Sequence, residues 1–487
     1  MTKANYFIGI DIGTSSIKTA VYSDNFTLVK EYSSSYEYVS TMDGWTEVDP
    51  VIWSTLVLEQ LSQIFESIPY QQVKGIGLTG QMHTTVFLDQ ANQPFRPAIM
   101  WNDKRTADIV EEIKGKLPRV KQTENIFSIL STGSPLANLI WLKKHEPENY
   151  QKLGKLLIAK DYVRYVLTGE LATDYCDAST SSLYDVISEQ WSTEVIHTFQ
   201  LFSDIFPEVK FAADFAGQLD LSLLGIETET TIPVVMGTGD NVASAIANQN
   251  QAQPIISLGT SGVVILTNQK GQWLNTGKNI LAKISADDQR VITQGALQSG
   301  AKVIDWWSRK IIQQDVTQFE DQLEQQLGEN QVLFFPYLNG DKTLFKESDL
   351  CGAFYGITLN HDQTNFSLAV YEGVAFAMKR LMQQMQPEQK GDILLIGGGA
   401  KSNIWPQIFA NVFNTTITVN QTAREASCGA AMLAYYHLFN EFPDLENELR
   451  ETIPEETLVK KYQKNYQAFI SFSDALIKKE RRERYEA

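Results

Sequence analysis

Apolar and polar residues follow two different rhythms along this chain, one typical of strands and the other of helices. Three short apolar runs end at glycine and predict buried strands at residues 73–78, 231–236 and 393–396. A helical spacing of apolar positions predicts helices at residues 52–64, 134–144, 240–247 and 368–385. Because ligands gather at the carboxyl ends of strands in α/β folds, these strand-ending glycines indicate a cleft.

Two hairpins of nearly the same sequence are predicted, one near the start of the chain and one just past its middle. Residues 10–17 read Ile-Asp-Ile-Gly-Thr-Ser-Ser-Ile, and residues 256–263 read Ile-Ser-Leu-Gly-Thr-Ser-Gly-Val. Each Gly-Thr-Ser tip lies between apolar runs, which predicts strand, turn and strand. Such tips expose N–H groups and hydroxyls that can surround a phosphate, although ordinary tight turns use the same residues. The repetition favours a duplicated domain that closes on one nucleotide.

The length of the chain predicts two domains, since 487 residues are too many for one core. We place an N-terminal domain at residues 1–248 and a C-terminal domain at residues 249–443, joined near the polar stretch 249–253. A helical extension follows at residues 444–487. This polar segment ends in a basic run, residues 478–484, and we expect a solvated surface helix rather than a binding tail.

The net charge and the cysteines limit which binding partners and which cellular compartment we expect. A net charge of −17 argues against nucleic acid and anionic membranes as partners. Three dispersed cysteines form no disulfide or zinc pattern and indicate a reducing compartment, and the five histidines have no ligand-like spacing. Neither a secretory segment nor an apolar run of membrane-spanning length is present, so we expect a cytoplasmic protein.

Six motifs together resemble the FGGY family of carbohydrate kinases, in order and in spacing. They occupy residues 6–15, 80–83, 101–105, 239–241, 257–262 and 397–400. The resemblance covers nearly the whole chain. It implies an α/β fold of two actin-like (ribonuclease H-like) ATPase domains from an ancient duplication, with the active site in the interdomain cleft. It also implies ATP and Mg²⁺ as cofactors and a small-molecule sugar as substrate, and it leaves a homodimer open.

Within that family, the Gln-Met-His sequence at residues 81–83 resembles the xylulose kinases, as do residues 43–50, 159–162 and 171–178. One stretch departs, because residues 340–344 read Gly-Asp-Lys-Thr-Leu where those enzymes usually have Gly-Glu-Arg-x-Pro. The resemblance implies phosphorylation of a ketopentose, D-xylulose, to D-xylulose 5-phosphate. Gluconate or another sugar is the alternative substrate, and an ATPase of the actin or chaperone kind is the second class of function.

Asp240 is the candidate general base. It follows Gly-Thr-Gly at a predicted strand end, where glycines let a substrate hydroxyl approach. Phosphoryl transfer needs a carboxylate that orients the attacking alcohol and accepts its proton. The alternative is a helix N-cap, a position that aspartate suits well. Beside it, Asn241 is expected to hydrogen-bond the sugar or to be a polar residue of the first helical turn.

Asp11 is the candidate acid for Mg²⁺, held through water because Mg²⁺ prefers few carboxylates and several waters. The second hairpin has Ser257 at this position, so only the first can hold a cation. The alternative is an inward charge that tightens the hairpin. Lys18 either neutralises phosphate or is a surface charge. The expected donors to the β- and γ-phosphates are Thr14, Ser15, Gly259, Thr260 and Ser261.

The glycine triplet at residues 397–399 is the candidate floor for adenine or ribose, through Gly398, Gly399 and Ala400. It is not a Walker motif, because Ala400 rather than glycine precedes the lysine. Asn403 is expected to bond the base. The alternative is an ordinary turn between a strand and a helix.

The sugar-side candidates follow two further motifs, and each could instead be a core residue. His83 is expected to hydrogen-bond a hydroxyl, Met82 to form an apolar wall under the carbon chain, and Trp101 to stack on a sugar face. The remaining candidates are Gln81 and Asp103.

Overall fold

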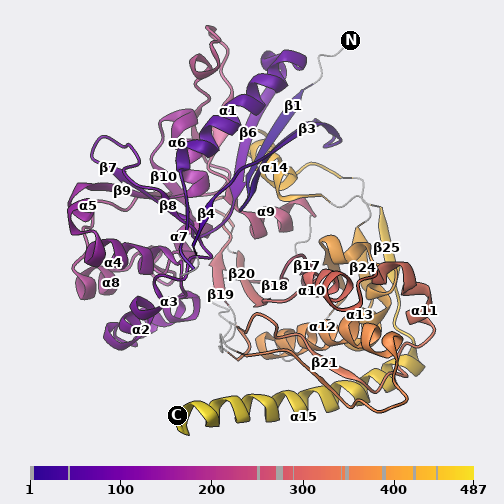
Figure 1. Ribbon diagram of the computed structural model, residues 1–487. Coiled ribbons are helices and arrows are strands. Elements are labelled where there is room, and N and C mark those ends of the chain that lie inside the picture. Colours follow the sequence, from indigo (N-terminus) through magenta and orange to yellow (C-terminus); the bar gives the residue numbers. More distant parts are fainter. Residues whose placement is uncertain are drawn as a thin grey trace.

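The computed structural model describes residues 5–41, 44–248, 253–269, 278–288, 290–341, 343–345, 350–386, 391–420, 424–445 and 448–486. The predicted joint at residues 249–253 therefore lies almost wholly outside the described residues, as does Lys342 in the departing stretch. Within the described ranges the chain forms two seven-stranded sheets with helices around them (Figure 1). The α/β architecture is thus confirmed.

The first sheet comes from the N-terminal half and has the strand order β14-β15-β6-β1-β2-β3, with β16 paired to β6. Its strands are β1 (Tyr6–Ile12), β2 (Ser16–Ser23), β3 (Leu28–Ser35), β6 (Val73–Gly80), β14 (Phe215–Gln218), β15 (Pro233–Val235) and β16 (Thr238–Gly239). The first predicted hairpin is β1 with β2, in an antiparallel pair that aligns Asp11 with Lys18. The predicted strands at residues 73–78 and 231–236 are β6 and β15.

The second sheet comes from the C-terminal half and has the order β19-β20-β18-β17-β23-β24-β25. Its strands are β17 (Ile255–Leu258), β18 (Gly262–Gln269), β19 (Lys278–Leu281), β20 (Arg290–Leu297), β23 (Ile393–Ile396), β24 (Ile417–Asn420) and β25 (Leu449–Thr452). The second predicted hairpin is β17 with β18. In both sheets the first hairpin strand pairs in parallel with the strand that ends in glycine, β6 or β23. This shared topology matches the repeated hairpin sequence.

A five-stranded sheet and three short ribbons complete the described β structure. The sheet has the order β4 (Val39–Ser40), β5 (Thr46–Val48), β8 (Ala98–Ile99), β7 (Thr85–Asp89) and β9 (Leu153–Ile158). The ribbons are β10 (Ala172–Asp174) with β13 (Glu208–Lys210), β11 (Tyr184–Asp185) with β12 (Gln190–Trp191), and β21 (Leu333–Phe335) with β22 (Ala353–Tyr355).

The helices of the N-terminal half are α1 (Pro50–Ser67), α2 (Ala107–Lys116), α3 (Glu124–Ile129), α4 (Pro135–His145), α5 (Pro147–Lys152), α6 (Ala159–Thr168), α7 (Tyr175–Thr180), α8 (Thr193–Phe199) and α9 (Asp240–Ala247). Those of the C-terminal half are α10 (Lys302–Trp306), α11 (Glu320–Glu324), α12 (Gln363–Met385), α13 (Trp405–Phe413), α14 (Ala426–Phe439) and α15 (Glu456–Glu486). All four predicted helices are confirmed, in α1, α4, α9 and α12. Helix α12 begins five residues before the apolar pattern because Asp362 caps it with a capping box.

Helix α14 belongs to the C-terminal half by sequence but packs on the first sheet, beside β1 and β6 (Figure 1). Glycines make this approach possible. A Cβ at Gly9 would lie 1.7 Å from the Ser427 carbonyl oxygen, and one at Gly77 would lie 1.8 Å from the Ala430 carbonyl oxygen. A Cβ at Gly429 of α14 would lie 1.9 Å from the Ala243 carbonyl oxygen of α9. Any side chain at these positions would push the helix off the sheet.

The C-terminal segment differs from its expected form in two ways. First, residues 449–452 form strand β25, which extends the second sheet by pairing with β24. Second, helix α15 is amphipathic and buries Tyr462, Tyr466 and Phe469 in the hydrophobic core formed with α12 and α13. The expected surface helix is thus amphipathic over residues 456–478, with one face in solvent and the other in the core. The side chains of residues 479–487 lie outside the described part of the chain.

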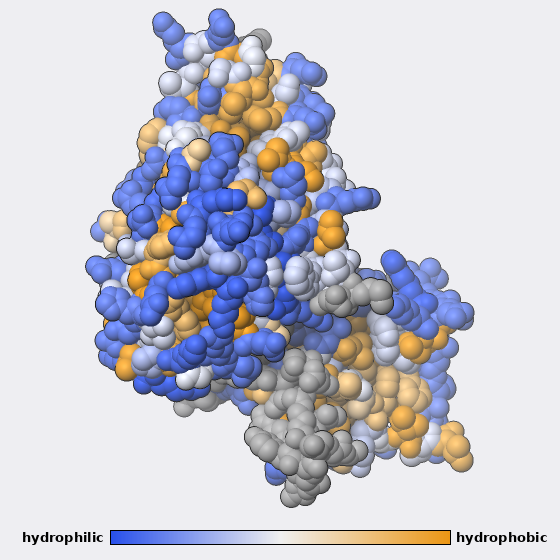
Figure 2. Space-filling view, turned by 60° about the vertical axis from the view of Figure 1, so that its left-hand side comes forward, coloured by the Kyte–Doolittle hydropathy of each residue, from blue (hydrophilic) through white to orange (hydrophobic). Residues whose placement is uncertain are grey.

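The surface of the protein carries both hydrophilic and hydrophobic side chains. On the face shown in Figure 2, hydrophilic side chains dominate the N-terminal half, and hydrophobic ones gather in separate areas. None of the described helices combines the length and the apolar character that crossing a bilayer requires.

Candidate active site

Asp11 and Asp240 lie at the same edge of the first sheet because three strands end there side by side. Asp11 on β1 aligns with Thr79 on β6, and Thr79 aligns with Thr238 on β16. Asp240 follows two residues later as the first residue of α9, and its Oδ1 accepts a hydrogen bond from the Asn241 N–H at 2.8 Å. The N-cap position is held by Gly239, so Asp240 does not cap the helix in the predicted alternative way.

Both carboxyl groups hold their protons more tightly than ordinary aspartates. Burial raises the pKa of Asp240 to about 6. Burial also raises the pKa of Asp11 to about 7, assisted by the charge of Asp240 and opposed by Lys18. The Oδ1 atom of Asp11 is buried and has no hydrogen-bond partner within the described residues. This edge of the sheet therefore carries two carboxyl groups with raised pKa values. One of them, Asp11, has an oxygen without a hydrogen-bond partner among the described residues.

Lys18 lies beside Asp11 in the hairpin but has other carboxylate partners. Its Nζ donates to the carboxylate of Glu425, which precedes α14, and lies 3.6 Å from that of Glu31. These glutamates raise the pKa of Lys18 against the effect of burial. Lys18 is therefore an ion-paired cation that links β2 to α14 while still lowering the pKa of Asp11.

Two side chains hold the tip of the first hairpin in place by hydrogen bonds. The carbonyl of Gly13 accepts from the hydroxyl of Tyr36 at 2.6 Å and from Nε2 of Gln81 at 3.1 Å. Gln81 also donates to the Tyr36 oxygen and accepts from Thr84, so its amide is fully used and only 3% exposed. We therefore assign Gln81 to holding the loop rather than to the sugar. Sequence reasoning missed Tyr36, which lies in a polar stretch without a motif.

Trp101 contacts the tip of the first hairpin. Its Nε1 donates to Oγ1 of Thr14 at 3.1 Å, and its ring is 42% exposed, enough to meet a ligand. Neighbouring Ser15 is also exposed at the loop tip, where its carbonyl accepts from the Tyr36 N–H. The structure thus brings Thr14, Ser15 and Trp101 together on one surface.

Met82 and Asn241 meet near the residue that precedes Asp240, and His83 follows Met82 in the chain. A Cβ at Gly239 would lie 2.7 Å from Cγ of Met82, so the glycine lets Met82 pack there. Nδ2 of Asn241 lies 4.0 Å from the sulfur of Met82 and 3.5 Å from Oε1 of Gln294 on β20. His83 has a left-handed backbone, with φ of 72°, a strained conformation that often marks a functional site.

Gln294 is a candidate that sequence reasoning missed. It reaches Asn241 from the other half of the chain, and its Nε2 is buried without a partner among the described residues. An unpaired amide beside Met82 and Asn241 is suited to a ligand oxygen. The only sequence signal is a polar residue within the apolar run of β20, and such residues are common on strand faces.

Asp103 is not open to a ligand. It is fully buried, and its two oxygens accept from the Thr46 N–H and from the backbone and side chain of Arg105. The Arg105 guanidinium also lies 4.1 Å from the ring of Trp45. We therefore assign Asp103 to fixing the loop that carries Trp101, in place of the expected contact with the sugar.

A buried ion network supports the turn that leads to Asp240. Lys160 lies 2.6 Å from Asp161, and its other carboxylate partners are Asp174 at 2.8 Å and Asp177 at 2.9 Å. Arg164 joins Asp161 at 2.6 Å and donates to the Met236 carbonyl at 3.1 Å, just before the Gly-Thr-Gly turn. Two of the xylulose-kinase-like motifs, residues 159–162 and 171–178, thus build this network.

The nucleotide-side candidates line a second region, a pocket of about 730 Å³ in the C-terminal half. Its walls include Gly259, Thr260, Gly398, Gly399 and Asn403, together with Trp405 and Tyr371. A Cβ at Gly398 would meet open space, whereas one at Gly399 would lie 2.7 Å from Leu258 and 2.9 Å from the Trp405 ring. The glycine triplet therefore leaves the pocket surface free of a side chain at Gly398 and packs closely on Leu258 and Trp405 at Gly399.

Two of the nucleotide candidates lie just outside this wall. Ala400 is buried in the turn after β23, and Ser261 uses its carbonyl to accept from the Gly259 N–H at 3.0 Å. Gly300 approaches the tip of the second hairpin closely, because a Cβ added at this position would lie 2.2 Å from the Ser261 carbonyl carbon. Its N–H donates to the Thr260 carbonyl at 3.0 Å, which fixes the loop tip.

Glu320 is a further residue of this pocket that sequence reasoning missed. Its Oε1 accepts from the hydroxyls of Ser402 at 2.8 Å and Tyr371 at 2.9 Å, and its Oε2 accepts from the Asn403 N–H at 2.8 Å. Glu320 is only 3% exposed, so it anchors the loop after the glycine triplet. It lies in a run of acidic and amide residues at 320–326, which offers no local signal.

No group of three or more His, Cys, Asp or Glu side chains is placed to hold a metal within the described ranges. The unpartnered oxygen of Asp11 nevertheless fits Mg²⁺, which takes one or two carboxylates and fills its remaining positions with water and phosphate oxygens. The raised pKa of Asp11 agrees with this fit, because a divalent cation would relieve its repulsion from Asp240.

Residues 6–247 match the N-terminal domain model of the FGGY family of carbohydrate kinases, and residues 255–438 match its C-terminal domain model. The xylulose kinase of Staphylococcus xylosus is 33% identical over 485 residues, which cover 96% of this chain and 100% of that protein.

Solved structures agree over nearly the whole chain. A "xyloylose kinase" from Brucella ovis superposes with a TM-score of 0.88 at 26% identity, covering 97% of this chain and 99% of that one. A gluconate kinase from Lactobacillus acidophilus has a TM-score of 0.89 at 22% identity, covering 97% and 98% of the two chains. At this identity, the second likeness extends to the fold alone.

Proposed function

Because this chain belongs to the FGGY family of carbohydrate kinases and is an ATP-dependent sugar kinase, we propose that it phosphorylates D-xylulose to D-xylulose 5-phosphate. The observation that carries the substrate is the 33% identity to a xylulose kinase over 96% of the chain. The family membership also decides against the actin- or chaperone-type ATPase, since those proteins phosphorylate no sugar.

In this proposal Asp240 is the general base. Its carboxylate accepts the proton of the C5 hydroxyl while that oxygen attacks the γ-phosphorus. The bond between the γ-phosphorus and the bridging oxygen breaks, and ADP leaves with the electron pair. A pKa raised to about 6 keeps most Asp240 ionised at neutral pH while making it a better base than an ordinary aspartate.

Asp11 would hold Mg²⁺ through water. The ion, when bound, neutralises charge on the phosphate oxygens. Thr14 and Ser15 of the first loop, with Thr260 and Ser261 of the second, donate to the β- and γ-phosphates. Lys18 acts indirectly in this account, because its charge is shared with two glutamates.

The pocket of about 730 Å³ takes the nucleoside. Gly398 and Gly399 form its floor, and the loop through Ala400 to Asn403, anchored by Glu320, carries the group that bonds the base. Burial of an aromatic base against such a bare glycine surface is favourable because no Cβ intervenes.

The sugar lies between Trp101 and the group formed by Met82, His83 and Asn241. Trp101 stacks on the carbon chain, Met82 forms an apolar wall, and His83 and Asn241 bond hydroxyls. We do not favour gluconate, because Lys18 is already ion-paired and Arg105 is buried against Asp103, which leaves both side chains in use.

The remaining parts of the proposal concern organisation. We assign an N-terminal domain to residues 1–248, a C-terminal domain to residues 249–443 and a helical extension to residues 444–487. The partners are the sugar and ATP, without nucleic acid or membrane. Cytoplasmic location and a homodimer remain expectations from the sequence.

The test is ADP release in a coupled assay with a panel of D-xylulose, D-ribulose and gluconate. D-xylulose should give the highest kcat/KM, and D-ribulose should be weaker because one inverted hydroxyl misaligns its hydrogen bond. A higher kcat/KM for gluconate than for D-xylulose would contradict D-xylulose as the substrate. The protein would still be a sugar kinase. ADP release that no sugar stimulates would overturn the phosphoryl-transfer proposal itself.

A further inference from the structure

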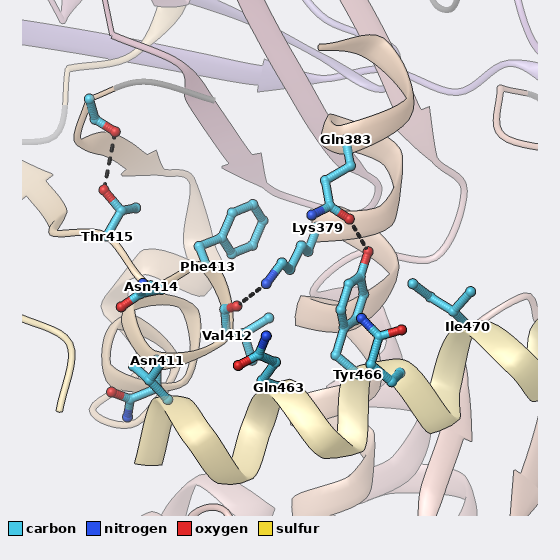
Figure 3. A pocket seen from close by; sticks show the side chains of 13 residues that line it. Lys379, Gln383, Asn411, Val412, Phe413, Asn414, Thr415, Gln463, Tyr466 and Ile470 are labelled. Atoms are coloured by element: carbon cyan, nitrogen blue, oxygen red, sulfur yellow. Dashed lines mark hydrogen bonds between the residues drawn. The ribbon is translucent and has the colours of Figure 1, made fainter. Parts of the chain in front are cut away.

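A second pocket, of about 620 Å³, lies between α12, α13 and α15 (Figure 3). It shares no lining residue with the nucleotide pocket. Its walls are Lys379 and Gln383 of α12, residues 411–415 at the end of α13, Gly391, and Val459, Gln463, Tyr466, Gln467 and Ile470 of α15. We call this space the Lys379 pocket.

Lys379 is the cation of this pocket. In Figure 3 its side chain reaches from α12 toward the end of α13, where Nζ donates to the Val412 carbonyl at 2.6 Å. The same Nζ lies 4.7 Å from the centre of the Tyr466 ring. No lining residue carries a carboxylate. Burial alone accounts for the lowering of the Lys379 pKa to about 8, which is the behaviour of an ammonium without a nearby counter-ion.

Neutral hydrogen-bonding groups line the rest of this pocket. In Figure 3 the amide of Asn411 points away from Lys379, toward the start of α15, where its Oδ1 accepts from the Glu455 N–H at 2.7 Å. The Gln383 side chain accepts from the Tyr466 hydroxyl at 2.6 Å. Gln463 and Gln467 are exposed at the rim, so the pocket opens to solvent on the α15 side.

We propose that the Lys379 pocket binds a small phosphate monoester of the sugar phosphate class. The ammonium of Lys379 supplies a charged donor to the phosphate, and the glutamines at the rim suit hydroxyl groups. A volume of about 620 Å³ accommodates a metabolite of this size.

A purely structural role for Lys379 explains less. A lysine at the C-terminal end of α13 is favourable because it meets carbonyl groups at the negative end of the helix dipole. That role accounts for the bond to Val412. It accounts neither for the pocket nor for the lack of a carboxylate among its lining residues. A phosphate monoester accounts for both.

Two of the three helices that line this pocket also line the nucleotide pocket. Helix α12 supplies Tyr371 to the nucleotide pocket and Lys379, two turns later, to the Lys379 pocket. Helix α13 begins at Trp405 in the nucleotide pocket and ends at Val412 and Phe413 in the other. A ligand that shifts either helix therefore changes the nucleotide pocket, and we expect it to alter KM for ATP.

The experiment is calorimetric titration of the full chain with glucose 6-phosphate, and separately with inorganic phosphate. D-xylulose and a non-hydrolysable ATP analogue are kept saturating so that the active site is filled. Saturable binding at one further site is expected, tighter for glucose 6-phosphate than for inorganic phosphate. The proposal is overturned if glucose 6-phosphate gives no saturable binding up to about 20 mM, a range that covers weak metabolite sites.

Three variants locate the binding. Lys379→Met removes the cation, and Gln463→Glu places a negative charge in the pocket. Each should weaken glucose 6-phosphate binding at least about tenfold, the usual scale for a charge-assisted contact. Lys460→Met, on the exposed side of α15, makes the same charge change and should leave binding unaltered. Binding that stays at the parental strength in either pocket variant that melts like the parent overturns the proposal.

Discussion

Burial and the nearby charge of Asp240 together raise the pKa of Asp11 to about 7. The two carboxylates meet because β1, β6 and β16 end side by side at one edge of the first sheet. An acidic pair of this kind is costly to the folded protein when it carries both charges. In the proposed mechanism this is the place that holds the cation and the proton acceptor, so we expect stability and activity to oppose each other there.

Asp11→Asn is expected to stabilise the protein in the absence of nucleotide and Mg²⁺. The folded pKa lies above the ordinary value, so the unfolded state ionises first and stability is lost as the pH rises from about 4 to about 7. The variant removes this penalty. At pH 8 its free energy of unfolding should exceed that of the parent by roughly 1–3 kcal/mol, measured by urea unfolding.

At pH 5 the same gain should be smaller, and phosphorylation should be strongly reduced at either pH. Asp108→Asn, on the exposed face of α2, makes the same chemical change at a carboxylate in solvent and serves as the control. An Asp11→Asn variant that is less stable than the parent at pH 8 would show that the carboxylate stabilises the hairpin.

Glu320→Gln is expected to raise KM for ATP and to leave KM for the sugar unchanged. The substituted amide cannot accept at both positions, so either the Asn403 N–H or the paired hydroxyls of Ser402 and Tyr371 lose an acceptor. Loss of such a buried bond costs about 1–3 kcal/mol, which corresponds to a rise of roughly tenfold if the loop moves.

The matched control for Glu320 is Asp321→Asn, one residue along the same helix and exposed. Steady-state kinetics with each substrate varied separately distinguish the two variants. A KM for ATP that changes by less than about twofold in Glu320→Gln would mean that the loop holds its place without this anchor.

Gly9→Ala should destabilise the protein severely, by about 3 kcal/mol or more, because the new Cβ would overlap the Ser427 carbonyl of α14. Gly115→Ala is the control, since a Cβ there meets nothing within 4 Å and the residue lies inside α2. The control should be neutral or slightly more stable. Equal melting temperatures for the two variants would show that α14 is not fixed to the sheet by this contact.

The sequence predicted the parts of the fold that local patterns determine. The two hairpins, the strands that end in glycine and four helices follow from periodicity and turn residues, and all are confirmed. The position of α14 on the first sheet could not be predicted, because its cause is the absence of side chains at Gly9 and Gly77, far away in sequence. Likewise, β25 forms only because β24 offers an edge.

The candidate site divides in the same way. Asp11 and Asp240 follow from motifs, and the register of three strands brings them together. Tyr36, Gln294 and Glu320 carry no motif, since their roles depend on partners far away along the chain. Motifs mark the groups that point at a ligand, whereas the groups that hold loops become visible only in three dimensions.

The amphipathic face of α15 shows a third limit. Its apolar residues at 462, 466 and 469 have helical spacing, but the polar average of the segment conceals them. Composition alone therefore suggested a solvated helix, although one side of it completes the core around α12 and α13.

The role of Asp240 is tested most directly by the kcat of Asp240→Asn, with D-xylulose binding measured in parallel by calorimetry. The account predicts a kcat lower by about 10²–10⁴-fold, with unchanged sugar affinity. Asp49→Asn, a true N-cap on α1, should retain the parental kcat. A kcat for Asp240→Asn that stays within about threefold of the parent, at unchanged affinity, would contradict the account.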